Sequence, residues 1–548
     1  MLSRAAVRQQ FPTIANGVNS VAFFFVSIFI AYVAFSRAIY DHHLVGDRVW
    51  IVYGILFAII LCGFKLSYAQ ATTAYRILTR SIIAFAMFYI VTSHIDVADT
   101  LLDGKALAAF ELNRFWIVAA LFGCAGFFRP VFGLVPLLYV QWQKHQWSYV
   151  FDTPIEWMDY FTLLETGSFL ILGYGIYALY RKFGVAALDM HTAKSALDDR
   201  KKDGTWFPHP VDVVVLFAVA LHFGNYFYAG LIKAALGDSP VDWVLNNRTQ
   251  ILVLAAWDSM VLPVSFSDAL TRGTYELISN VRVVTNLVTI TIQILAAVAI
   301  VRLRWAILIT LSYDLLHTII FFTTGIFFWK FIILNLAIVA ALSAMSAPAI
   351  PRRLKLALSS AVILSPFVFH IYPSFAWLDT PAINQVRLYA VTDDGKEYRV
   401  PSNYFLAASV NFAQDRWVWP EHGFFPTETW GTTRINAAAK AAQDCPNWVR
   451  TEEKFLKTPF DLPRDRIERV VRRGHAQILS MVDENGYVDY DLFPHHIFSM
   501  PWYFSEFKQI DKRRIVAFRY ESQAVCIGYE DGQLTKQKKY SSTFDIPL

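Results

Sequence analysis

The segment His222–Trp243, HFGNYFYAGLIKAALGDSPVDW, places Lys233 inside an apolar helix. The apolar run around it, residues 211–235, is long enough to cross a bilayer. A charged lysine is costly in hydrocarbon, so a lysine at this position indicates a functional site. Burial disfavours the ammonium form, and the neutral amine can serve as a general base. The alternative is that Lys233, close to the helix end, extends its ammonium group into the lipid headgroups.

The whole chain has the composition of a multi-pass membrane protein. Hydrophobic residues make up 55% and charged residues 17% of its 548 residues, and the mean hydropathy is +0.38. The net charge of +5 is spread along the chain, without a basic stripe interleaved with aromatic residues. The lipid bilayer, and not nucleic acid, is therefore the expected partner. The first apolar run lacks a small-residue cleavage site, which predicts a retained span.

About eleven apolar runs are candidate membrane spans, and Arg129-Pro130 divides the longest stretch, 112–145, into two of them. The runs cover residues 17–37, 49–64, 81–95, 112–128, 131–145, 160–179, 211–235, 283–301, 305–326, 329–345 and 356–371. Basic residues gather in the loops on one side, which the positive-inside rule assigns to the cytoplasm. They include Arg76, Arg80, Arg129, Arg200, Lys201, Lys202, Arg302, Arg304, Arg352 and Arg353. This pattern predicts a plasma (inner) membrane protein with a cytoplasmic N-terminus and its C-terminus outside.

The fold class expected is a polytopic all-α transmembrane bundle followed by an extracytoplasmic α+β domain rich in β-hairpins. Residues 1–372 form the transmembrane domain and residues 373–548 the soluble domain, where the composition becomes polar. The stretch 237–282, interrupted by Asp258 and Pro263, is predicted to be a re-entrant or interfacial element on the outer face. In the soluble domain, residues 386–400 and 514–534 are hairpins around Asp-Gly, and residues 463–481 are a helix. Cys445 and Cys526 either pair or remain free thiols.

Polar side chains within the spans are the candidate site residues. Asp314 and His317 are three residues apart and share a helix face, where they could carry protons or orient a hydroxyl group. The alternative is a polar pair that is satisfied between packed helices. His222, Asn225 and Tyr226 precede Lys233 on its helix and are candidate cofactor-binding residues. The histidine pairs elsewhere in the chain lack the additional ligands of a metal site, so no bound metal is expected.

Four segments resemble, in order, the vitamin K-dependent gamma-carboxylases and their bacterial relatives, which share a transmembrane module called the HTTM domain. The segment YFYAGLIKAALGDSPVDWV resembles the lysine segment of that family. Residues Gly126–Val140 resemble its arginine-turned hairpin, and Leu311–Trp329 its helix with Ser-Tyr, a histidine and a glycine. The hairpin Val386–Val400 resembles the start of its lumenal domain. Together these segments span most of the chain.

The resemblance implies a carboxylase-like reaction that depends on a reduced, vitamin K-like quinone. In that family a lysine three residues after an Ala-Gly deprotonates the hydroquinone; Lys233, three after Gly230, matches it. Oxygen then converts the cofactor to a strong base that removes a proton from a glutamate of a peptide substrate, and carbon dioxide adds. The family's histidine lies two residues after Ser-Tyr, where this chain has Leu315; its own histidine, His317, comes two residues later.

Two other classes of function are compatible with the sequence. One is a non-catalytic HTTM-type membrane scaffold whose outer domain binds a partner protein. The other is a transporter, which is disfavoured because no duplicated pair of interrupted spans is evident. The enzyme requires Lys233 to face a cavity with His317 or His222 nearby, whereas the scaffold allows Lys233 to point into the headgroups.

Overall fold

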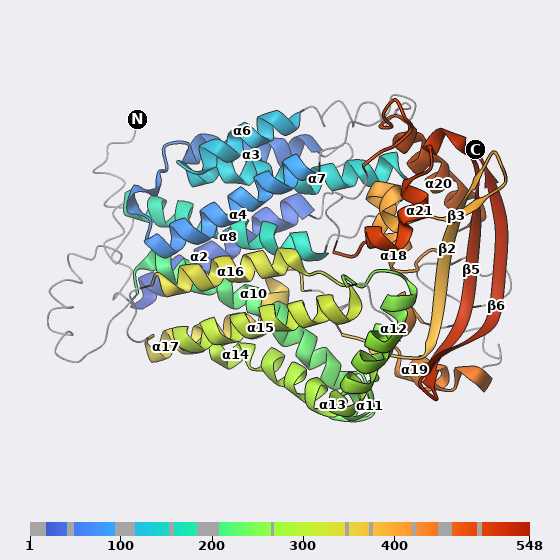
Figure 1. Cartoon of the computed structure of the whole chain (residues 1–548). Helices are drawn as coiled ribbons and strands as arrows, with labels where there is room; N and C mark the ends of the chain where they lie inside the picture. Colours follow the sequence, from blue (N-terminus) through green and yellow to red (C-terminus); the bar gives the residue numbers. More distant parts are fainter. Residues whose placement is uncertain are drawn as a thin grey trace.

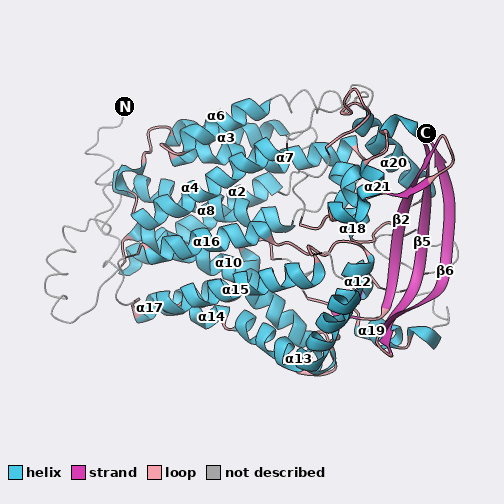
Figure 2. Ribbon diagram, viewed as in Figure 1, coloured by secondary structure: helices cyan, strands magenta, loops and turns pink. Residues whose placement is uncertain are grey.

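The structure is a computed structural model, and it places a β-sheet domain at one end of a helical bundle (Figure 1). Figure 2 shows the three long strands side by side beyond the helices. The described residues are 18–40, 49–93, 115–152, 158–182, 208–264, 268–345, 350–371, 376–418, 424–425, 427–447, 463–489 and 496–548. The predicted domain boundary at residues 372 and 373 and the basic residues Arg200, Lys201 and Lys202 lie outside them.

Helices occupy all of the apolar runs predicted from the sequence. They are α2 (Val18–Tyr40), α3 (Val49–Gly63), α4 (Thr73–Thr92), α6 (Trp116–Gly126), α7 (Leu134–Val150), α8 (Met158–Lys182), α10 (Pro210–Ala235), α13 (Asp268–Ile294), α14 (Ala296–Ala299), α15 (Leu303–Thr324), α16 (Trp329–Ser343) and α17 (Arg352–Ile363). Five helices in the described part of the chain are long and apolar enough to cross a membrane. They lie in α4, α8, α10, α13 and α15. The protein is thus a membrane protein by the length and composition of its helices.

Helix α10, which carries Lys233, is the central helix of the bundle. It packs against α4, α8, α13 and α17, and 89% of its apolar window is buried. Because it is apolar around its whole circumference, it has to be covered by protein on every side. The predicted turn between α6 and α7 is also present: Pro130 begins a short 3₁₀ helix, and the Tyr68 hydroxyl donates to the Gly126 carbonyl at 3.0 Å.

The helix predicted to begin at residue 283 was placed too late. Helix α13 begins at Asp268, inside the stretch expected to be interrupted, and it ends at Ile294. Its first two turns pack against the sheet domain, where the Tyr275 and Tyr529 rings have centroids 4.8 Å apart. These turns contain polar residues, so the apolar run in the sequence begins later than the helix does. Helix α4 likewise begins at Thr73, eight residues before the predicted start.

The C-terminal sheet is antiparallel, with strand order β3-β2-β5-β6. Its strands are β2 (Ala382–Thr392), β3 (Glu397–Arg399), β5 (Ile515–Glu530) and β6 (Gln533–Pro547), and a small second sheet pairs β1 (Leu378–Asp379) with β4 (Thr432–Thr433). Both predicted hairpins are confirmed: β2 joins β3 through Gly395 at φ 76°, and β5 joins β6 through Asp531 and Gly532, both with positive φ. The pairing of β2 with β5 joins segments more than a hundred residues apart.

Short helices surround the sheet and connect it to the bundle. They are α11 (Asp242–Asn246), α12 (Gln250–Asp258), α18 (Ser409–Ala413), α19 (Asn436–Gln443), α20 (Arg464–Leu479) and α21 (Ser505–Lys508). Helix α20 confirms the predicted helix at 463–481. Helix α12 is buried in one apolar cluster with Ile383 and Val525 of the sheet, and Figure 1 shows it between the bundle and the strands. The predicted interrupted element therefore lies against protein.

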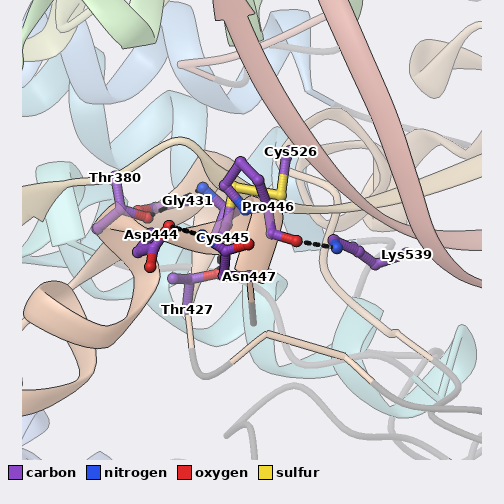
Figure 3. Close-up of a disulfide and its surroundings, with 10 residues drawn as sticks. Thr380, Thr427, Gly431, Asp444, Cys445, Pro446, Asn447, Cys526 and Lys539 are labelled. Carbon is purple, nitrogen blue, oxygen red and sulfur yellow. Dashed lines mark hydrogen bonds between the residues drawn. A yellow bond between two sulfur atoms is a disulfide. The ribbon is translucent and has the colours of Figure 1, made fainter. Parts of the chain in front are cut away.

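A disulfide joins Cys445 and Cys526, which decides between the two possibilities left open by the sequence (Figure 3). The Cα atoms are 5.8 Å apart, within the usual range for a bridge. Cys526 lies on β5, and Cys445 begins a short 3₁₀ helix (Cys445–Asn447) after α19. Lys539 of β6 donates to the Pro446 carbonyl beside the bridge. The bridge thus fixes the segment that carries α19 to the sheet.

Candidate functional site

Lys233 lies in the last turn of α10, and its side chain is inside the protein. The residue is 8% exposed. Its Nζ donates to the Ala229 carbonyl at 3.4 Å and lies 5.6 Å from the ring centroid of Trp243. The chain turns back after Gly237, so that α11 places this tryptophan over the lysine. The side chain of Lys233 is therefore covered by protein.

Asp379 brings a carboxyl group from the small sheet to the lysine. It interacts electrostatically with Lys233. Asn247 fixes it by two hydrogen bonds: the Asn247 amide donates to Asp379 Oδ2 at 2.7 Å, and the Asp379 backbone N–H donates to Asn247 Oδ1 at 2.8 Å. Burial raises the pKa of Asp379 to about 7, although Asn247 and Lys233 act in the opposite direction. This carboxyl can thus exchange a proton close to neutral pH.

A second polar group lies deeper in the bundle and is centred on Asn335 of α16. The Asn335 amide donates to Asp314 Oδ1 at 2.7 Å and to the Tyr226 hydroxyl at 2.9 Å. Its Oδ1 lies 3.0 Å from His222 Nε2. An amide oxygen can only accept, so His222 donates through Nε2–H. One side chain therefore connects α10, α15 and α16.

Aromatic rings enclose this network. The Tyr226 and Tyr313 rings stack with centroids 3.6 Å apart, and the His317 ring lies 5.8 Å from that of Tyr226. Within the part of the chain that is described, His222 Nδ1, Asp314 Oδ2 and His317 Nδ1 are buried without a hydrogen-bond partner. Such atoms are costly in a low-dielectric interior and are typical of functional sites.

The structure brings four of the six predicted site residues together: His222, Tyr226, Asp314 and His317. The predicted pairing of Asp314 and His317 on one face is present, since both are buried. His317 faces inward at 8% exposure, whereas Leu315, two residues earlier, is 63% exposed. Lys233 lies two turns beyond this group with other neighbours, and Asn225 donates to the His222 carbonyl within its own helix at 3.3 Å.

Sequence reasoning missed the residues that connect the predicted ones. Asn335 is a polar residue in the apolar run FIILNLAIVAAL. A lone polar residue within a membrane helix is a signal of a functional site, and this signal could have identified Asn335 from the sequence. Glu165 of α8 was available in the same way; its carboxylate accepts from the backbone N–H of His370 at 2.7 Å and lies 2.8 Å from His370 Nδ1. Asp379 gave no such signal, because it lies in a polar segment of ordinary composition.

Comparisons with protein-family models, with curated proteins and with solved structures find no match. Among the described residues, no group of three His, Cys, Asp or Glu side chains is arranged to hold a metal ion. The function has therefore to be inferred from the geometry of Lys233, its neighbours and the Asn335 network.

Asn335→Leu is expected to lower the stability of the bundle by about 2 kcal/mol, because hydrogen bonds between membrane helices average roughly 0.6 kcal/mol each and three are lost. Reversible unfolding in mixed micelles measures the change. Asn225→Leu is the matched control, since this buried asparagine bonds within its own helix, and it should change stability by less than about 0.5 kcal/mol. Equal losses in the two variants would show that the network does not stabilise the helix contacts.

Proposed function

We propose that this protein is an integral membrane enzyme in which Lys233 is the general base for an acidic hydroxyl group of a lipophilic molecule. The observation that carries the proposal is the position of Lys233: it is buried at the end of α10, beside a carboxyl group from the C-terminal region. A lysine shielded from water can act as a base at neutral pH. The position lies where the bundle meets the sheet domain, with Trp243 of α11 over the lysine.

The surroundings of Lys233 fit a reduced quinone, the cofactor implied by the resemblance to the carboxylases. Trp243, whose ring lies over Lys233 Nζ, belongs to one apolar cluster with Leu236, Ile290 and Leu378. Asp379 Oδ1 is buried and has no hydrogen-bond partner in the described parts of the chain. A flat apolar ring with a hydroxyl group matches this combination. When bound, a reduced quinone would supply the acidic hydroxyl and the reducing electrons.

The residues define where the proton goes. Lys233 Nζ would accept it from the hydroxyl group, and Asp379 would receive it from Lys233. Because the pKa of Asp379 is raised to about 7, its carboxylate form is populated at neutral pH and can take up a proton. Asn247 holds Asp379 in place, so it is a positioning residue for this transfer.

The test is to incubate the purified protein in lipid nanodiscs with a naphthoquinol and to measure binding and the absorbance of the deprotonated quinol. The proposal expects stoichiometric binding and a spectral shift that depends on pH. A protein that binds no quinol and produces no shift would instead support the non-catalytic membrane scaffold.

The orientation proposed is a cytoplasmic N-terminus with the sheet domain outside, in a membrane crossed about eleven times. Two observations support it. Arg302, Arg304, Arg352 and Arg353 lie at the starts of α15 and α17, and Figure 1 shows these starts at the end of the bundle opposite the strands. In addition, the Cys445–Cys526 disulfide is typical of proteins outside the cytoplasm.

Cysteines introduced at Arg353 and Lys396, both exposed, should react with a membrane-impermeant maleimide from opposite sides. The background is Cys62→Ser with Cys124→Ser, which removes the free thiols. Right-side-out vesicles are expected to label only Lys396→Cys, and inside-out vesicles only Arg353→Cys. Labelling of both from one side would show that the number of crossings between them is even.

A further inference from the structure

A small cavity lies between the end of α12 and strand β2, far from Lys233 in the sequence. Its volume is about 30 Å³, which is room for one or two water-sized groups. Polar and apolar side chains line it. The six polar ones are Ser259, Arg387, Arg399, Ser402, Asp415 and Ser499. Two guanidinium groups therefore face the same small space.

Positive charge exceeds negative charge around the cavity. Asp258 accepts hydrogen bonds from Arg387 at 2.7 Å and from Lys536. Burial raises the pKa of Asp415 to about 6, so this carboxyl group is still mainly ionised at pH 7. With Arg399, three cations face two anions, which leaves one positive charge uncompensated. An uncompensated charge in a partly buried site is unfavourable unless a counter-ion is present.

The two carboxylates are already engaged and do not satisfy Arg399. Asp415 Oδ1 accepts from the Val386 backbone N–H at 3.0 Å, and its Oδ2 accepts from the Ser259 hydroxyl at 2.9 Å. Asp258 is bound by Arg387, Lys536 and the Gln385 amide. Each of these four carboxylate oxygens therefore already accepts from a donor other than Arg399.

Arg399 is the group that lacks partners. A guanidinium has five N–H donors, but among the described residues Arg399 makes one hydrogen bond, to the Asp258 carbonyl at 3.4 Å. Its other contact is with the Phe504 ring, 6.0 Å away. Burial and the charge of Arg387 lower the pKa of Arg399, and they outweigh the opposite effect of the Asp258 and Asp415 charges.

We propose that this cavity binds one small monovalent anion of the size of chloride, held by Arg399 and Arg387. One negative charge balances the excess, and the cavity excludes larger anions such as gluconate. Asp258 is the last residue of α12 and Ser259 follows it, whereas the two arginines belong to the sheet. The anion would therefore join α12 to the sheet domain. The site is separate from the lysine site and does not depend on the enzymatic function.

The test is thermal unfolding of the purified full-length protein in detergent, with chloride replacing gluconate at constant ionic strength. Chloride is expected to raise the Tm of the wild type by roughly 2–4 °C in a saturable manner. Arg399→Gln should abolish the chloride dependence. Arg519→Gln is the matched control: this arginine lies on the same sheet but pairs with Glu397 and Asp545 at the surface, so the chloride dependence should persist.

Two results would overturn the proposal. One is a wild-type Tm that does not change with chloride, and the other is the same chloride dependence in Arg399→Gln as in the wild type. If Arg399→Gln does not fold, chloride line broadening in nuclear magnetic resonance of the wild type decides instead. Broadening that bromide competes away supports the site, and its absence rejects it.

Discussion

Lys233→Met is expected to lower turnover by roughly 10²–10⁴-fold, the contribution typical of a general base, while the protein remains folded. Methionine has a similar length and no charge, so it fits among the apolar neighbours of Lys233. Turnover is the rate of quinol deprotonation, measured as the appearance of quinolate absorbance after quinol is mixed with the protein in nanodiscs, and folding is measured as the Tm in detergent. Lys440→Met is the control, because this exposed lysine pairs with Asp238 at the same end of α10 and should leave turnover unchanged.

Lys233→Arg should be the more damaging variant for stability. The guanidinium cannot give up its proton, so arginine would place a permanent charge in the protein interior. Lysine at the same position can also exist as the neutral amine. A loss of about 3 kcal/mol or more is expected for an uncompensated buried charge. A stable Lys233→Arg variant would mean that the side chain reaches water. Full turnover in Lys233→Met would show that Lys233 is not the general base.

Loss of the Cys445–Cys526 disulfide is expected to destabilise the sheet domain by about 4 kcal/mol. The bridge closes a long loop, with a sequence separation of 81 residues, and the entropy of the unfolded chain rises when such a loop opens. Cys445→Ser, Cys526→Ser and reduction of the wild type should all give the same loss in denaturant unfolding. Agreement of the three values would show that the bond, and not a packing defect at one position, is responsible.

The control uses the other two cysteines. Cys62 and Cys124 are free and exposed on the bundle, so their replacement by serine should have little effect on the sheet domain. Intact-mass measurement after alkylation without reductant should find two modified thiols in the wild type. Four modified thiols would show that the disulfide does not form in the cell.

Local signals in the sequence determined much of the architecture. The Asp-Gly turns determined both hairpins, because their geometry requires residues that tolerate positive φ. Arg129-Pro130 determined the turn between α6 and α7, since proline cannot continue the preceding helix. The apolar run around Lys233 determined that the lysine lies within a helix. Each of these depends on residues that are neighbours along the chain.

The candidate site was only partly accessible in this way. His222, Tyr226, Asp314 and His317 stand out as polar residues in apolar helices, and the structure brings these four together. Their connection through Asn335 depends on which faces of α10, α15 and α16 meet. A single sequence shows the face of each helix but not its neighbour, because packing angle and register are decided by the shapes of all side chains together.

The sequence by itself thus determined a membrane protein of apolar helices, a polar C-terminal region with two hairpins, and a lysine within an apolar helix. The tertiary structure alone decided that α13 begins at Asp268, that β2 pairs with β5, that Cys445 bonds Cys526, and that Asp379 lies beside Lys233. These contacts join segments distant along the chain. They form because burial of apolar surface brings such segments together, and that choice is made by the whole molecule and not by any one segment.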